Sequence, residues 1–274
     1  GNSLIDDVEI AGELAFNWEK EFSQVFKNGG FDVVVGNPPY VLCQPSNTEE
    51  KILKFYNSFE VANYKIDLYH LFFEKGIKIL NPKGYLGFIT PNTYLTNKYT
   101  VNLRKLILEK TSINTIIKYN EIVFAEAGVD VVTILLSNFK IKNNKINILS
   151  SKNKTLTVID KKEQEIWEND ELKVFNLNKE LSIKLENTIL LDKIYSVTFG
   201  LQTKDKSKYV SEIKSPEWEE CYTGKNISRY FLSKANLYFY NNPIEVKAGG
   251  SWNMKLHKSK KIVVRQVGNP EPVF

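Results

Sequence analysis

One stretch of the chain combines residue types that can do specific chemistry, namely residues 37–40, Asn-Pro-Pro-Tyr, which follow the apolar run 31–36. The run is short and rich in valine, which is typical of a buried strand in a parallel sheet. Two consecutive prolines fix φ, so the turn after this strand is rigid. An amide and an aromatic ring presented at the carboxyl edge of a sheet can together hold a flat ring that carries an amine.

The chemistry suited to such a turn is activation of an aromatic amine, whose lone pair is delocalised and poorly nucleophilic. The side-chain oxygen of Asn37 and the carbonyl oxygen of Pro38 can accept hydrogen bonds from the amine and favour a tetrahedral nitrogen. Tyr40 offers a stacking face, and Phe124, expected in a loop between two strands, is a candidate second face. The alternatives are an ordinary strand-to-loop turn at residues 37–40 and a core aromatic at Phe124.

These residues need a scaffold, and up to about residue 137 apolar strands alternate with amphipathic helices. This alternation predicts an α/β fold with a parallel, doubly wound sheet. Asp67 precedes a strong helical stripe and is expected to cap that helix rather than to act as a catalyst. The predicted strands are 31–35, 85–90, 113–119 and 131–137, and the predicted helices are 16–26, 48–59, 68–80 and 95–110.

The pattern changes in the Lys- and Asn-rich stretch after residue 138, which predicts a domain boundary between about 140 and 155. We therefore expect domains at 1–145 and 146–274, the second a mixed, β-rich α+β domain. Residues 1–140 carry 14 basic and 16 acidic side chains, whereas residues 141–274 carry 23 basic and 16 acidic ones. This excess is expected of a domain that contacts phosphates, although a generally Lys-rich proteome explains it equally well.

Composition excludes several classes of protein. The two cysteines have neither metal-ligand nor redox-motif spacing, which predicts a reduced, cytoplasmic protein without a metal site. No apolar run approaches the roughly 20 residues that cross a bilayer, so no membrane association is expected.

Several blocks of the first half together resemble the N6-adenine DNA methyltransferases. More narrowly, they resemble the methyltransferase part of the fused restriction–modification enzymes of type IIG. The resemblance covers most of residues 1–137. The blocks that carry it are residues 1–5, 16–18, 31–41, 67–69, 82–92 and 103–105.

The resemblance implies a partial Rossmann-like methyltransferase sheet that acts on double-stranded DNA with S-adenosylmethionine as cofactor. Such enzymes flip the target base out of the duplex. By this resemblance the catalytic turn comprises Asn37, Pro38, Pro39 and Tyr40, and the flipped adenine stacks on Tyr40 and Phe124. Asn2 would lie where the family contacts the adenine of the cofactor.

The second half is similar to the TaqI-like C-terminal specificity domains, which recognise the target sequence. The similar segments are residues 199–203, 224–230 and 261–266. Arginine can read guanine edges or clamp phosphates, so Arg229 and Arg265 are candidate DNA contacts, with surface ion pairs as the alternative. Lys225 and Lys204 are further candidates. Tyr230 and Trp252 could support a base step, but we expect both to pack a small core.

One departure from the family concerns the cofactor. The glycine-rich turn that follows the first strand and binds S-adenosylmethionine is absent, because the pair at 29–30 precedes a strand and the pair at 249–250 lies in the second domain. We therefore expect this segment to begin within a methyltransferase fold, to be inactive alone, and to need a missing upstream part of the same polypeptide. The alternatives are a protein-glutamine methyltransferase and a non-catalytic DNA-binding remnant.

Overall fold

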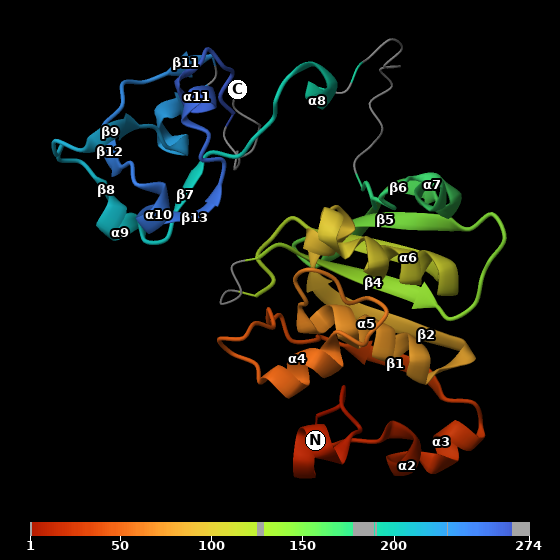
Figure 1. Cartoon of the computed structure of the whole chain (residues 1–274). Helices are drawn as coiled ribbons and strands as arrows, with labels where there is room; N and C mark the ends of the chain where they lie inside the picture. Colours follow the sequence, from red (N-terminus) through yellow and green to blue (C-terminus); the bar gives the residue numbers. More distant parts are fainter. Residues whose placement is uncertain (1, 125–128, 178–188, 190, 229, 265–274) are drawn as a thin grey trace. The chain divides into compact units, whose positions relative to one another are not determined.

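The computed structural model describes residues 2–124, 129–177, 189, 191–228 and 230–264. The chain forms two compact units, Gly1–Ser182 and Ile183–Phe274 (Figure 1). In the described part of the chain, no helix has both the length and the apolar character that a membrane crossing requires.

A six-stranded sheet organises the first unit. Its spatial order is β1-β2-β4-β3-β5-β6, and the pairs β1–β2 and β3–β5 are parallel. The α/β fold class is confirmed, but the sheet is mixed, because β4 runs antiparallel to both β2 and β3 and β6 runs antiparallel to β5. The connection 120–130 between β3 and β4 is too short for a crossover helix, so the chain reverses there. The strands are β1 (Phe31–Gly36), β2 (Leu80–Pro91), β3 (Ser112–Tyr119), β4 (Val131–Ser137), β5 (Lys145–Lys152) and β6 (Thr155–Glu163).

The helices largely follow the predicted stripes. The predicted helix 16–26 is interrupted at Phe22, and the start of the predicted helix 95–110 is replaced by two 3-10 turns. The strand predicted at 85–90 begins earlier, since Leu80 already pairs with Phe31 of β1. The elements are α1 (Val8–Ala11), η1 (Gly12–Leu14), α2 (Trp18–Glu21), α3 (Ser23–Lys27), α4 (Glu50–Tyr56), α5 (Leu68–Ile79), η2 (Asn92–Leu95), η3 (Lys98–Thr100), α6 (Val101–Lys110) and α7 (Gln164–Asn169).

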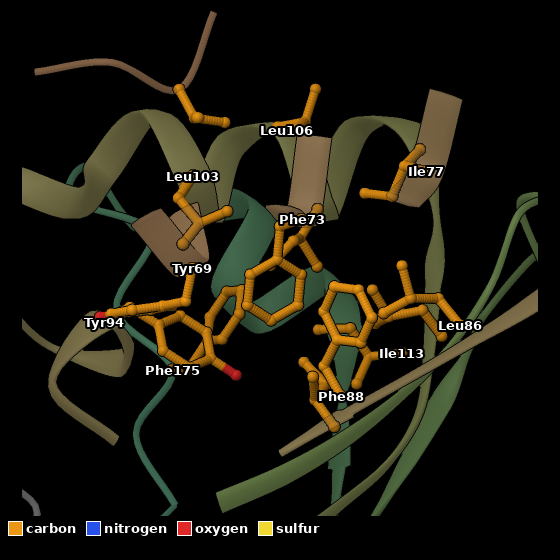
Figure 2. Packing of buried hydrophobic residues seen from close by; sticks show 14 of the residues in the cluster. Tyr69, Phe73, Ile77, Leu86, Phe88, Tyr94, Leu103, Leu106, Ile113 and Phe175 are labelled. Atoms are coloured by element: carbon orange, nitrogen blue, oxygen red, sulfur yellow. The ribbon is translucent and has the colours of Figure 1, made fainter. Parts of the chain in front are cut away.

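The core lies between the sheet and the helices α5 and α6, which cover the same face (Figure 1). Figure 2 shows Phe73 of α5 beside Phe88 of β2, with ring centroids 5.3 Å apart. Gly76 allows this close approach, because a Cβ there would lie 2.7 Å from Leu86 Cδ1. Packing of this kind fixes β1 and β2, and with them the edge where residues 37–40 emerge.

On the face of the sheet opposite α5 and α6, strands β1 and β2 present exposed apolar side chains. Val33 and Val35 of β1 are exposed, Val35 to 76%, although side chains of parallel strands are normally covered on both faces. Tyr85 pairs with Val33 in the register and is exposed as well. Among the described strands, β1 also has a neighbour on one side only.

The first unit extends beyond the domain boundary predicted at 145/146. Strand β5 adds to the sheet beside β3, and α7 packs near α6. Trp167 stacks on Phe175 at 4.8 Å, and the Phe175 amide donates to the carbonyl of Leu95. The residues after 145 therefore complete the first unit, and the division between units falls at Ser182 and Ile183.

The second unit contains short strands, as the sequence predicts, together with short helices. Its largest sheet has the order β8-β12-β9, and β10–β11 and β13–β7 form separate antiparallel pairs. Phe239 and Val246 are buried in its small core. The elements are α8 (Leu191–Ile194), β7 (Leu201–Thr203), α9 (Lys206–Tyr209), β8 (Val210–Ser211), β9 (Trp218–Cys221), η4 (Gly224–Asn226), β10 (Ile227–Ser228), β11 (Phe231–Leu232), β12 (Leu237–Tyr240), α10 (Pro243–Val246), β13 (Lys247–Gly250) and α11 (Met254–Lys258).

Candidate active site at the end of β1

The turn at residues 37–40 leaves β1 directly at the edge of the sheet. Pro38 is buried, whereas Asn37 is exposed and makes no side-chain hydrogen bond to any described residue. The hydroxyl of half-buried Tyr40 donates to the carbonyl of Ile89 on the neighbouring strand β2, at 3.2 Å. Burial fixes Pro38 and a hydrogen bond fixes Tyr40, whereas the side-chain amide of Asn37 remains available to a ligand.

The structure brings together the two aromatic rings that the sequence proposes as stacking faces. The centroids of Tyr40 and Phe124 lie 6.4 Å apart with an interplanar angle of 69°. Tyr40 also contacts the ring of Tyr69 from α5, with the centroids 6.3 Å apart and an interplanar angle of 81°. Burial raises the pKa of Tyr40 and of Tyr69, so both rings stay neutral.

These residues line a cleft of about 680 Å³, which lies within the usual range of small-molecule pockets. Four of its lining residues were not foreseen as part of a site. Thr93 belongs to η2, and its hydroxyl shares a hydrogen bond of 3.2 Å with that of Tyr69. The lining residues are Asn37, Pro38, Pro39, Tyr40, Asp67, Pro91, Thr93, Phe124 and Val129.

Asp67 combines two positions in the fold. It is the N-cap of α5, as predicted, and its backbone amide donates to Nδ1 of His70 in a capping box. Residues 41–43 also fold back beside residues 66–68, with an isolated bridge between Leu42 and Asp67. This pairing places Asp67 in the wall of the cleft. No local sequence pattern predicts that position.

The electrostatics around Asp67 are unusual for a helix cap. Its Oδ1 is buried and has no hydrogen-bond partner among the described residues. Burial raises the pKa of Asp67 to about 6, against a weaker lowering by nearby backbone amides. Burial also lowers the pKa of His70 to about 4, so the imidazole beside it is neutral. Perturbed carboxyl groups in clefts are enriched at functional sites.

Arg104 does not line the cleft, but its hydrogen bonds hold the turn that contributes Thr93 to it. Its side chain is fully buried, and its guanidinium donates to the carbonyls of Tyr94 and Asn97 at 2.6 and 2.8 Å. It also donates to the carbonyl of Leu172 at 2.7 Å. These bonds tie the turn that contains Thr93 to α6 and to the segment after α7.

Asn2, the candidate cofactor contact, is placed elsewhere. It forms a parallel bridge with Ala15, and its Oδ1 accepts a hydrogen bond from the Leu4 amide at 3.2 Å. A hydrogen bond from the Asn2 side chain also lowers the pKa of Tyr56, which burial raises. Asn2 is not one of the residues that line the described cleft.

The DNA-binding candidates belong to the second unit. Lys204 and Lys225 are exposed, whereas Arg229 and Arg265 lie outside the described residues. Trp252 is half-buried near the ring of Phe239, as expected of a packing residue. The expectation that Tyr230 packs a core is wrong, because its side chain is 81% exposed. Within the described residues, no three His, Cys, Asp or Glu side chains cluster as metal ligands.

Comparison with known proteins identifies the relatives of the chain. Residues 2–124 match the family of the Eco57I restriction-modification methylase. The chain is 26% identical over 275 residues to the putative type II restriction enzyme and methyltransferase RM.MjaORFECS2P of Methanocaldococcus jannaschii, covering 94% of this chain and 22% of the relative. It is 32% identical over 121 residues to the type II restriction enzyme and methyltransferase RM.Eco57I of Escherichia coli, covering 43% of this chain and 12% of the relative.

A solved structure supports the fold assignment. The type IIL restriction-modification enzyme MmeI, solved in complex with DNA, aligns with a TM-score of 0.53 and 14% identity, over 82% of this chain and 30% of that one. The chain thus spans less than a third of the length of each of these three proteins. The chain is therefore similar to type II restriction-modification methyltransferases, and its residues 2–124 match the Eco57I restriction-modification methylase family.

Proposed function

We propose that the chain is the base-binding part of a restriction-modification enzyme of type IIG that methylates N6 of adenine in double-stranded DNA. The observation that carries this proposal is the cleft in which the free amide of Asn37 lies beside the paired rings of Tyr40 and Phe124. A target base must leave the duplex to enter it, at a cost of a few kcal/mol of unstacking.

The residues of the turn act on the amine of the base. The side-chain oxygen of Asn37 and the carbonyl of Pro38 accept its two hydrogens, which concentrates the lone pair on nitrogen as a methyl group approaches. Burial of Pro38 and the hydrogen bond of Tyr40 to β2 hold these acceptors in place, so little reorganisation is needed. Tyr40 and Phe124 position the flipped base by stacking.

S-adenosylmethionine would supply the methyl group, but the described residues lack the turn that would hold it. In the described part of the first unit, no strand is followed by a glycine-rich turn that opens a helix. Gly30 serves packing instead, because a Cβ there would lie 2.6 Å from the carbonyl oxygen of Ile79. The exposed Val33 and Val35 and the open side of β1 favour a neighbouring segment of the same polypeptide, which would hold the cofactor.

The second unit would recognise the target sequence. Residues 183–274 carry 15 basic and 9 acidic side chains, an excess suited to the phosphates of duplex DNA. A protein-glutamine methyltransferase, which uses a similar turn on a side-chain amide, would not need a basic unit of this kind. A non-catalytic DNA-binding remnant would keep DNA affinity but transfer no methyl group.

The test uses the polypeptide as its gene encodes it, with labelled S-adenosylmethionine and unmethylated duplex DNA. Asn37→Ala should lower kcat for methyl transfer by roughly 10²- to 10³-fold, the size seen when one polar contact to a transition state is removed. The dissociation constant for DNA should stay within about twofold, because phosphate contacts dominate affinity. Asn28→Ala removes another exposed amide, which lies outside the cleft and donates only to the Gln24 carbonyl among the described residues, and is the control.

The alternatives give different results in the same assays. Wild-type protein that binds duplex DNA but incorporates no methyl group would support a remnant. Methyl incorporation into protein without DNA binding would support a glutamine methyltransferase. If Asn37→Ala lowers DNA affinity and methyl transfer by the same factor, the role of the residue is structural and the proposed chemistry is wrong.

A further inference from the structure

A short hairpin in the second unit has a strained and exposed tip. Strands β10 and β11 pair antiparallel through Ile227 with Leu232 and Ser228 with Phe231, and Tyr230 directly precedes β11. Tyr230 has a φ of +60°, in the left-handed region that turns usually fill with glycine or asparagine. A tyrosine at this φ costs stability, so we expect its aromatic ring to serve a purpose other than stabilising the fold.

Hydrogen bonds hold the root of the hairpin, so the register of β10 and β11 cannot shift to relieve the backbone strain at Tyr230. Asn226 is buried, and its Nδ2 donates to Ser233 Oγ, the Lys234 carbonyl and Asn236 Oδ1 at 3.0–3.3 Å. Its Oδ1 accepts from the Thr223 amide at 2.9 Å. One buried amide thus joins the two arms of the hairpin on the side away from the turn.

The tip presents aromatic surface to solvent. Tyr230 is 81% exposed, and the adjacent Phe231 is 65% exposed. Neither ring serves the small core of the second unit, in which Phe239 and Val246 are buried. Backbone strain retained at an anchored site is typical of functional positions.

Charge indicates what this surface binds. Lys225 and Lys234 flank the hairpin, both are exposed, and neither pairs with a carboxylate in the described part of the chain. These two cations lie at the root of a hairpin whose tip is aromatic, and the excess of basic residues over 183–274 adds to them. Stacking rings combined with phosphate-binding cations are typical of nucleic acid binding; an apolar protein partner has no need of the cations.

We infer that the β10–β11 hairpin is a DNA-contacting element, in which Tyr230 at the tip stacks against a base of the duplex while Lys225 and Lys234 at the root contact phosphates. Aromatic and apolar side chains of other DNA-binding proteins enter base steps in this way. The inference rests on the proposed function, because it takes DNA as the partner. The stacking contact of Tyr230 is additional to the contacts made in the cleft.

The experiment measures binding of the polypeptide, as its gene encodes it, to a fluorescein-labelled duplex by anisotropy over a range of salt concentrations. Tyr230→Ala should weaken binding by about 5- to 150-fold, the range for loss of one base–aromatic stack. The slope of log K against log salt should not change, because no charge is lost. Lys225→Ala should reduce that slope by about 0.9. Tyr195→Ala removes another exposed tyrosine of the same unit and is the control, with affinity expected to stay at the wild-type value.

A second variant separates function from folding. Tyr230→Gly relieves the strain at φ +60°, so the melting temperature of the protein should rise while DNA affinity falls as in Tyr230→Ala. A fall in both quantities would show that the ring is structural and would overturn the inference. Unchanged DNA affinity in both Tyr230 variants would also overturn it and would leave a protein partner as the occupant. If the wild-type protein binds no duplex at all, the proposed function is what fails.

Discussion

Replacing Asp67 by Asn isolates the contribution of one buried carboxylate to both stability and function. The carboxylate lies in the wall of the cleft, and its Oδ1 has no hydrogen-bond partner among the described residues. Asparagine has nearly the same shape and can still cap α5, so the substitution chiefly removes charge. We expect the variant to be more stable than the wild-type protein at neutral pH.

The magnitude follows from the pKa values. The pKa of Asp67 rises from 3.8 to about 6 on folding because burial disfavours the charged form. The folded state therefore binds this proton more tightly than the unfolded chain. Stability is full below pH 4 and is lost as the pH rises to about 6. Each pKa unit corresponds to about 1.4 kcal/mol, so the cost at pH 8 is at most about 3 kcal/mol, and about 1–3 kcal/mol for this half-buried group.

His70 has the opposite sign in an overlapping range. Its pKa falls from 6.5 to about 4 on folding, so its contribution is full above pH 6.5 and is lost as the pH falls through 4. In the wild-type protein the two residues partly cancel between pH 4 and 6. In the Asp67→Asn variant only the histidine remains, so stability should decrease more steeply on acidification.

The assay is urea unfolding at pH 5, 6.5 and 8, with amide exchange of peptides from α5 to assign the transition to the first unit. Asp130→Asn, which removes an exposed carboxylate outside the cleft lining, is the control and should match the wild-type protein at each pH. Methyl transfer is measured in parallel, and we expect it to fall in Asp67→Asn if the site uses the charge. A variant no more stable than wild type at pH 8 would refute the argument from burial.

Two further substitutions test the scaffold of the cleft. Arg104→Met keeps most of the buried volume but removes all the guanidinium hydrogen bonds, so we expect a loss of about 2–4 kcal/mol in urea unfolding, together with faster amide exchange in residues 92–100 and 172–177. Gly76→Val places side-chain atoms where even a Cβ lies 2.7 Å from Leu86, so it should cost about 2 kcal/mol or more by the same measurement, whereas Lys75→Val on the same helix should cost little.

The parts of the candidate site that the sequence predicts are those whose structure is specified by residues adjacent in the sequence. The valine run 31–36 and the two prolines specify a strand that ends in a rigid turn, whatever lies around it. Phe124 was found because the strands on either side of its loop, β3 and β4, each have a clear apolar pattern. Their mutual direction was not readable, because an all-apolar strand has the same pattern in parallel and antiparallel pairs.

The parts that were missed depend on pairing between distant segments. The sequence assigns the Lys- and Asn-rich stretch around β5 to a domain boundary, yet Ile146 and Ile148 are fully buried in the core of the first unit. The sequence predicts that Tyr230 packs because aromatic residues usually do, yet it precedes β11 in a short hairpin and is 81% exposed.

Arg104 shows how such long-range pairing reaches the cleft. A buried guanidinium normally needs a carboxylate, but its acceptors among the described residues are the Thr100 hydroxyl and backbone carbonyls from two separate segments. Losing either set would leave a buried charge partly unsatisfied, which costs more than losing a neutral hydrogen bond. Because of this, a displacement at Leu172 must either break a charged hydrogen bond or move Tyr94 and the adjacent Thr93 with it. The segment after α7 therefore helps to position Thr93 in the wall of the cleft, although it lies more than 70 residues from Thr93 in sequence.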